Sequence, residues 1–180
     1  MGNLARFVGP ASLVTAAFAA AIYVVVYQLV DVGIGRGEVP SNVLQRFSEY
    51  TGVDGSEAGF ADAAATVTAQ TALSTFTAVT AFILILFLAP PRRFFAGWTQ
   101  PVKDTLPARL VLCLFAAFAL VLAFPPAAHY FALLPAFKVL LPVILITVPI
   151  WFFLLRGMWR HRLLERILDL PQRPSTIETS

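Results

Sequence analysis

The sequence predicts an all-α, polytopic membrane protein whose four transmembrane helices pack as an antiparallel bundle. Hydrophobic residues make up 58% of the 180 residues and charged residues only 13%, and the mean hydropathy is +0.78. Soluble domains are about 45–50% apolar and about 25% charged. Four apolar stretches approach or exceed the roughly 20 residues that a membrane helix needs. The basic residues also gather next to alternate ends of these stretches, as the charge rule for membrane topology requires.

The four predicted spans cover about residues 7–30, 67–89, 107–127 and 139–155. The first is longer than the apolar core of a signal peptide, which has about 7–15 residues, so we interpret it as a retained helix. The third is short on hydropathy alone and gains length from Pro107, a residue that suits the first position of a helix. The fourth contains Pro142 and Pro149, which membrane helices tolerate as kinks.

Charge then predicts the orientation, because Lys and Arg are retained on the cytoplasmic side. The connection 31–66 is acidic, whereas the connection 90–109 and the segment 156–170 are basic. We therefore expect both termini in the cytoplasm, an outer loop at 31–66, a cytoplasmic loop at 90–109, a cytoplasmic helical extension at 156–170 and a disordered tail at 171–180. The expected location is the inner (plasma) membrane. The arginines predicted to anchor the chain at the membrane surface are Arg92, Arg93, Arg156, Arg160 and Arg162.

Two further helical segments follow from local patterns. In the outer loop, Ser41 is the expected N-cap of a short amphipathic helix with Val43, Leu44 and Phe47 on its apolar face. This helix would lie on the membrane or on the other helices, with a ligand lid as the alternative. After the fourth span, we expect the helix to continue to about Leu170. Phospholipid headgroups are the nearest anions to its arginines, so lipid is the expected partner and nucleic acid is not.

Aromatic and small residues predict how the spans sit and pack. Tyr23 and Tyr27 at one side, and Trp151 and Trp159 at the other, suit the aromatic belts at the two membrane interfaces. Small residues of the first two spans are expected to face inward, because they let helices approach closely.

The second span carries polar residues in rows at helical spacing, and Gln70, Ser74 and Thr77 form one of them. One interpretation is an ion path lined by hydroxyl groups, as in a small oligomeric channel. The other, which we favour, is close packing with hydrogen bonds between helices. No Asp, Glu, Lys or Arg lies deep inside any span, although such residues are the usual mark of a transport site. His129, in the short outer connection, is a pH-sensitive group or an interface residue.

No arrangement of nucleophile, base and orienting group is recognisable in the sequence, nor is a glycine-rich phosphate loop. The two histidines and single cysteine are too far apart for the usual metal-ligand spacing. We therefore assign no catalytic residue, cofactor or metal, and expect no enzymatic activity from this chain alone.

Four segments resemble the C-terminal membrane region of bacterial P-type cation-transporting ATPases. They are "ARFVGPASLVTAAFAAAIYVVV", "LFLAPPRRFFAGW", "LVLAFPPAAHYFALLPA" and "LLRGMWRHRLLERIL". In that family the last four membrane helices follow the phosphorylation and nucleotide-binding domains. The resemblance implies the same order of loops as the charge pattern. The family's phosphorylation motif and its ion-binding broken helix do not occur here, so no catalytic or ion-binding residue is carried over.

The resemblance implies a membrane-support bundle of a cation pump, present as a fragment or a split subunit. The expected partners are the lipid bilayer and the catalytic remainder of such a pump. The alternative is a small integral membrane protein that stabilises or assembles another membrane complex.

Overall fold

A computed structural model describes residues 2–88 and 105–160, with side chains for residues 8–88 and 105–159. Its elements are all helical, and four of them are long and apolar enough to cross a membrane. This confirms the predicted all-α class and the prediction of a multi-pass membrane protein. The four long helices are α1 (Gly2–Gly35), α3 (Phe60–Leu88), α4 (Leu106–Ala123) and α6 (Phe137–Arg160). Two short helices, α2 (Ser41–Thr51) and α5 (Pro125–Tyr130), lie in the connections.

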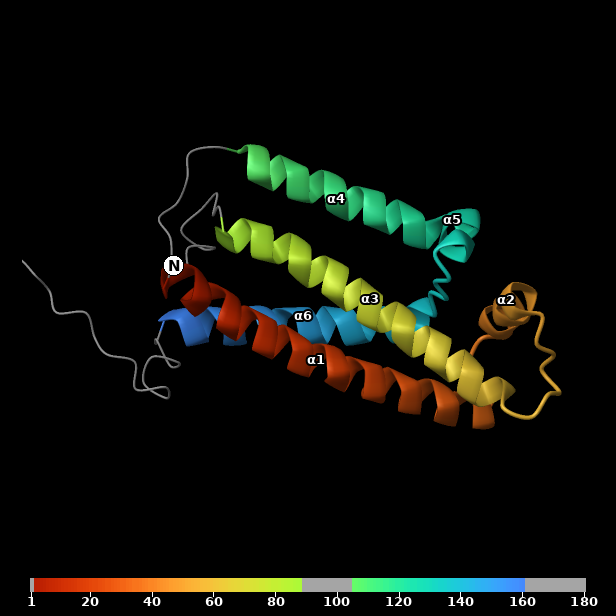
Figure 1. Cartoon of the computed structure of the whole chain (residues 1–180). Coiled ribbons are helices and arrows are strands. Elements are labelled where there is room, and N and C mark those ends of the chain that lie inside the picture. The colour runs from red at the N-terminus through yellow and green to blue at the C-terminus, as the bar shows by residue number, and fades with distance from the viewer. Residues whose placement is uncertain (1, 89–104, 161–180) are drawn as a thin grey trace, which may run out of the picture.

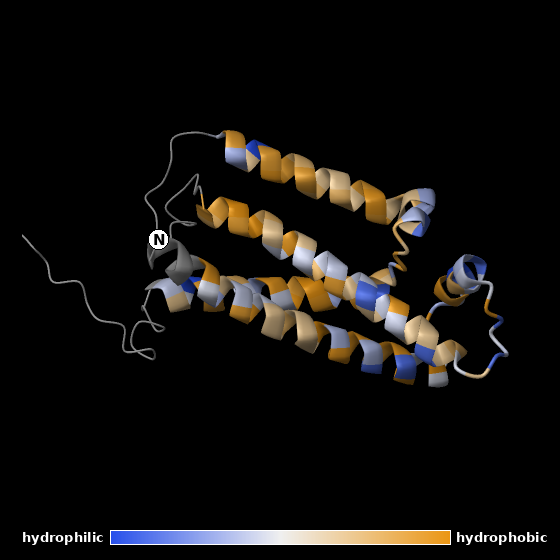
Figure 2. Ribbon diagram, in the orientation of Figure 1, coloured by the Kyte–Doolittle hydropathy of each residue, from blue (hydrophilic) through white to orange (hydrophobic). Residues whose placement is uncertain are grey.

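Helices α1, α3 and α6 pack against one another, whereas α4 packs along α3 and joins α5 (Figure 1). Apolar residues dominate the long helices, and polar residues concentrate toward the end that carries α2 and α5 (Figure 2). We call this the α2 end of the bundle. The outward surfaces of the long helices carry large exposed apolar side chains, such as Leu13, Leu112 and Leu145. A lipid bilayer is the environment that suits such a surface.

Close contact between α1 and α3 depends on small residues of α3. Ala65, Ala69 and Ala72 are fully buried, so the backbones approach closely there. Helix α1 contributes branched side chains to this contact, and Ile22 and Val26 are almost completely buried. The prediction that small residues face inward is therefore right for α3 and right only in part for α1. There Ala11 is buried in the core, but the exposed residues include Ala16, Ala17, Ala20 and Ala21. Larger side chains on α1 fill the space that the alanines of α3 leave open.

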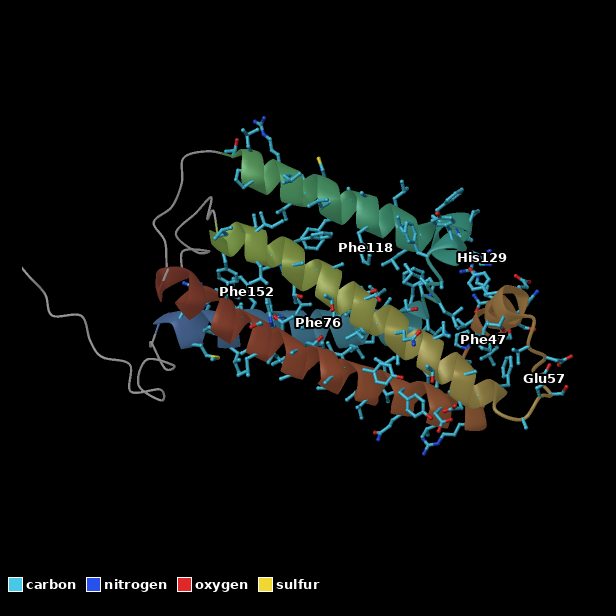
Figure 3. The ribbon with its side chains drawn as sticks, viewed as in Figure 1. Phe47, Glu57, Phe76, Phe118, His129 and Phe152 are labelled. Carbon is cyan, nitrogen blue, oxygen red and sulfur yellow. The ribbon has the colours of Figure 1, made fainter. Side chains whose placement is uncertain are left out.

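Trp151 of α6 lies in the centre of this three-helix core. Its side chain is fully buried, and its indole N–H donates a hydrogen bond to Thr15 Oγ1 of α1 at 3.0 Å. Its ring meets Phe76 of α3 edge to face, with centroids 6.3 Å apart. Phe76 is labelled in Figure 3. The placement of Trp151 in an aromatic belt is therefore wrong. Thr15 satisfies the one polar atom of the indole, so the ring can occupy the core.

At the α2 end, a second apolar cluster attaches the short helices to the bundle. Val43 and Phe47 of α2 are buried against residues of α3 and of the connection before α6, including Phe60 and Leu134. The amphipathic helix thus lies on the other helices. Its N-cap is Pro40, with φ −58° and ψ 133°, and no side chain caps it. Ser41 is already helical, so the predicted cap at Ser41 is wrong by one residue.

The helix bounds differ from the predicted spans at several ends. Helix α1 continues beyond residue 30 to Gly35, and α3 begins at Phe60 instead of residue 67. The predicted third span is interrupted at Phe124, which is extended with φ −94° and ψ 106°, and α5 follows. Proline at the two positions after Phe124 explains the break, because proline disfavours helical geometry in the residue before it. The predicted extension beyond residue 160 and the tail lie outside the described residues.

Candidate functional site

The buried hydroxyl groups of α3 are satisfied within the protein. Thr68, Thr75 and Thr80 are buried, and each donates a hydrogen bond to the carbonyl four residues earlier in the helix. Thr71 does the same to Val67 at 2.9 Å, and its oxygen also accepts the backbone N–H of Leu134 at 2.8 Å. These hydroxyls therefore donate their protons within the protein, and Thr71 also joins α3 to the connection before α6.

The predicted row Gln70, Ser74 and Thr77 lies on the exposed face of α3. All three side chains are exposed, and within the described part of the chain the structure gives none of them a hydrogen bond. Gln70 adjoins Thr71 and is level with the connection before α6. Ser74 and Thr77 lie about 6 and 10 Å further along the helix axis from Gln70, at 1.5 Å per residue. Helix α4 does not cover this row, because it packs beside it through Phe82, which meets Phe115 edge to face at 5.2 Å.

A groove opens at the α2 end between α1, α6 and the start of α2. It consists of two adjoining hollows of about 530 Å³ and 380 Å³, which share Val39, Pro40, Lys138 and Val139 as lining residues. We call it the α1–α6 groove. A Cβ atom at Gly33 would lie only 3.1 Å from Val39 Cγ2, so the glycine lets the chain before α2 pass close to α1. This close passage forms one wall of the groove.

The two hollows differ in character. The larger one follows α1 and α6, between Val25 and Leu29 on one side and Val143 and Ile146 on the other. Thr147 also lines it, but its hydroxyl donates to the carbonyl of Val143 at 2.6 Å and therefore contributes little polarity. The smaller hollow lies nearer α2 and is lined by Asn42, Arg46 and Lys138 among apolar residues. The groove thus passes from apolar walls to a cationic mouth.

Side-chain contacts between separate elements brace this end of the bundle. The Tyr27 hydroxyl of α1 donates a hydrogen bond to Asp62 of α3. The Tyr50 ring of α2 stacks on His129 of α5, with centroids 4.3 Å apart and an interplanar angle of 6° (Figure 3). His129 thus makes a packing contact between α5 and α2. Both contacts join elements that are distant in sequence, so the patterns within single segments did not predict them.

Most of the arginines predicted to anchor the chain at the membrane surface cannot be placed. Arg92, Arg93 and Arg162 lie outside the described residues, and Arg160 lies outside the described side chains. Arg156 is half-buried on α6. Arg46 and Lys138 line the same groove, which the sequence patterns did not predict. The available signal was a cation at the start of the fourth span and another on the amphipathic helix of the outer loop. In the part of the chain that the structure describes, no cluster of three or more His, Cys, Asp or Glu side chains could hold a metal ion.

Comparisons with known proteins find no matching family model, no matching curated protein and no matching solved structure.

Proposed function

We propose that this protein is a structural subunit of a larger membrane complex and binds a transmembrane helix of another protein through the polar row of α3. In this proposal the four long helices form an antiparallel bundle with both termini in the cytoplasm. The basic segments on one side and the acidic connection 31–66 on the other support that orientation. The inner (plasma) membrane is the proposed location.

The observation that carries the proposal is the contrast between two sets of polar residues on one helix. The buried threonines of α3 all donate to carbonyls of their own helix. The side chains of Gln70, Ser74 and Thr77, in contrast, are exposed and make no hydrogen bond within the described residues. Ser74 and Thr77 lie further from the α2 end than Gln70 does, and a hydroxyl without a hydrogen bond in an apolar environment costs roughly 2–7 kcal/mol. A neighbouring membrane helix with polar side chains removes that cost, and Ser, Thr and Gln are typical of such interfaces.

The resemblance to cation-transporting ATPases gives one candidate for the partner. If the chain is a separate support bundle of such a pump, the neighbouring helix belongs to the subunit that carries the phosphorylation domain. A rigid bundle without charged residues deep in its spans would then give the moving, ion-binding helices a fixed surface. An adjoining reading frame that encodes a phosphorylation domain would favour this candidate over an unrelated complex.

Purification from native membranes in mild detergent tests the proposal. The variant carries leucine at Gln70, Ser74 and Thr77, and the control carries Ser12→Leu, which changes an exposed hydroxyl on α1. Interhelical hydrogen bonds contribute about 0.6 kcal/mol each, so three of them correspond to about a twenty-fold change in affinity. We expect a stoichiometric partner with wild type and the control and its loss with the triple variant. Wild type that purifies alone, or a partner that the triple variant retains, would contradict the proposal.

The same experiment identifies the kind of complex. A partner with a phosphorylation domain would assign the bundle to a cation pump, whereas an unrelated membrane complex would assign it to the more general assembly role.

A further inference from the structure

We propose that the α1–α6 groove binds an anionic phospholipid, with its phosphate at the cationic mouth and an acyl chain along the apolar hollow. The proposal concerns a different surface from the polar row of α3 and does not depend on that row having a partner.

The apolar hollow matches an acyl chain in shape and chemistry. It runs along α1 and α6 between Leu29 and Ile146, both of which are more than half exposed. Its volume of about 530 Å³ lies within the range of small-molecule sites, about 300–1,000 Å³. Its walls belong to two helices that are apolar enough to cross a membrane, so it opens to the layer in which lipid tails lie.

The charges at the mouth favour an anion. Lys138 lines both hollows, Arg46 lines the smaller one, and Glu38 lines the larger one. Lys138 is exposed and Arg46 is half-buried, and neither has an ion pair with a carboxylate among the described residues. Two cations therefore face one carboxylate, which leaves an excess positive charge where the apolar walls end.

The mouth also lies at the starts of two helices. Asn42 near the start of α2 and Phe137 at the start of α6 line the smaller hollow. The backbone N–H groups of Val43, Phe137 and Val139 already donate to backbone carbonyls, so these helix starts contribute chiefly the positive ends of their dipoles. A positive helix end favours an anion, which reinforces the attraction of Lys138 and Arg46. A phosphodiester with attached hydrocarbon chains is the ligand that uses the cations and the apolar hollow together.

Labelling with photoreactive lipids tests this proposal. The purified full chain is placed in nanodiscs that contain a trace of photoreactive phosphatidylglycerol or phosphatidylcholine, and adducts are mapped by mass spectrometry. The variants are Lys138→Gln and Arg46→Gln. The control is Arg36→Gln, which changes an exposed cation near the same end that lines neither hollow. A further variant, Ile146→Trp, fills the apolar hollow from an exposed position.

We expect phosphatidylglycerol to label the segments around Leu29 and Ile146 several-fold more than phosphatidylcholine does. Loss of either Lys138 or Arg46 should reduce this labelling about five-fold, the ratio that corresponds to about 1 kcal/mol for one cation at an anionic membrane surface. Ile146→Trp should reduce it while circular dichroism stays unchanged, and Arg36→Gln should leave it unchanged. Equal labelling by the two lipids, or an equal loss in Arg36→Gln, would overturn the proposal.

Discussion

Replacement of Thr71 by valine tests whether one hydrogen bond fixes the start of α6 to α3. Valine keeps nearly the same shape, but it removes the oxygen that accepts the backbone N–H of Leu134. Leu134 is only 1% exposed, so water does not replace the lost acceptor. A buried donor left without a partner costs about 1–3 kcal/mol. We therefore expect the equilibrium constant for unfolding to rise about 5-fold to about 150-fold, at 1.4 kcal/mol for each factor of ten.

Thr75→Val provides a matched control on the same helix. Thr75 is also buried, but its hydroxyl only donates to the carbonyl of Thr71 in its own helix. Removing it leaves no buried donor without a partner, so we expect a smaller destabilisation than for Thr71→Val, at most the roughly 1 kcal/mol of one ordinary hydrogen bond. Reversible unfolding in mixed micelles, followed by circular dichroism, measures both variants. Equal destabilisation by the two substitutions would mean that the Thr71–Leu134 hydrogen bond does not fix the start of α6 to α3.

Three further predictions concern packing, a turn and topology. Thr15→Val should cost about 1–3 kcal/mol in the same unfolding assay, because the buried Trp151 N–H loses its acceptor; no loss would mean that this bond is unimportant. Gly52→Ala should cost about 1 kcal/mol, because Gly52 ends α2 at φ +71°; an unchanged midpoint would contradict this. In a cysteine-free background, Ser56→Cys should react with an impermeant thiol reagent in intact cells and Thr105→Cys only after permeabilisation; the reverse pattern would contradict the proposed orientation.

The sequence predicted those features of the fold that depend on local composition and periodicity. Long apolar runs predicted the four membrane helices, and the spacing of Val43 and Phe47 predicted a short amphipathic helix. The break at Phe124 was missed because the adjacent prolines and alanines kept the segment apolar. Hydropathy measures how a segment partitions into a membrane, and it does not report whether the backbone stays helical.

Side-chain direction was harder to predict, because it depends on which helices become neighbours. Tryptophan is typical of membrane interfaces, yet Trp151 is buried in the core, because Thr15 on a different helix accepts the hydrogen bond of its indole N–H. The row Gln70, Ser74 and Thr77 was identified by its spacing, but spacing alone does not tell whether the row faces the bundle or the membrane. The residues that line the groove are spread along the sequence between positions 25 and 147. The pattern within any single segment therefore does not predict the groove.

We propose that the polar row of α3 faces another protein in the membrane. Site-specific photo-crosslinking in native membranes measures this directly, with the probe at Ser74 or, as a control, at Leu112, which is 70% exposed on α4. We expect a discrete protein adduct from position 74 and only lipid adducts from position 112. Lipid adducts alone from position 74 would contradict it.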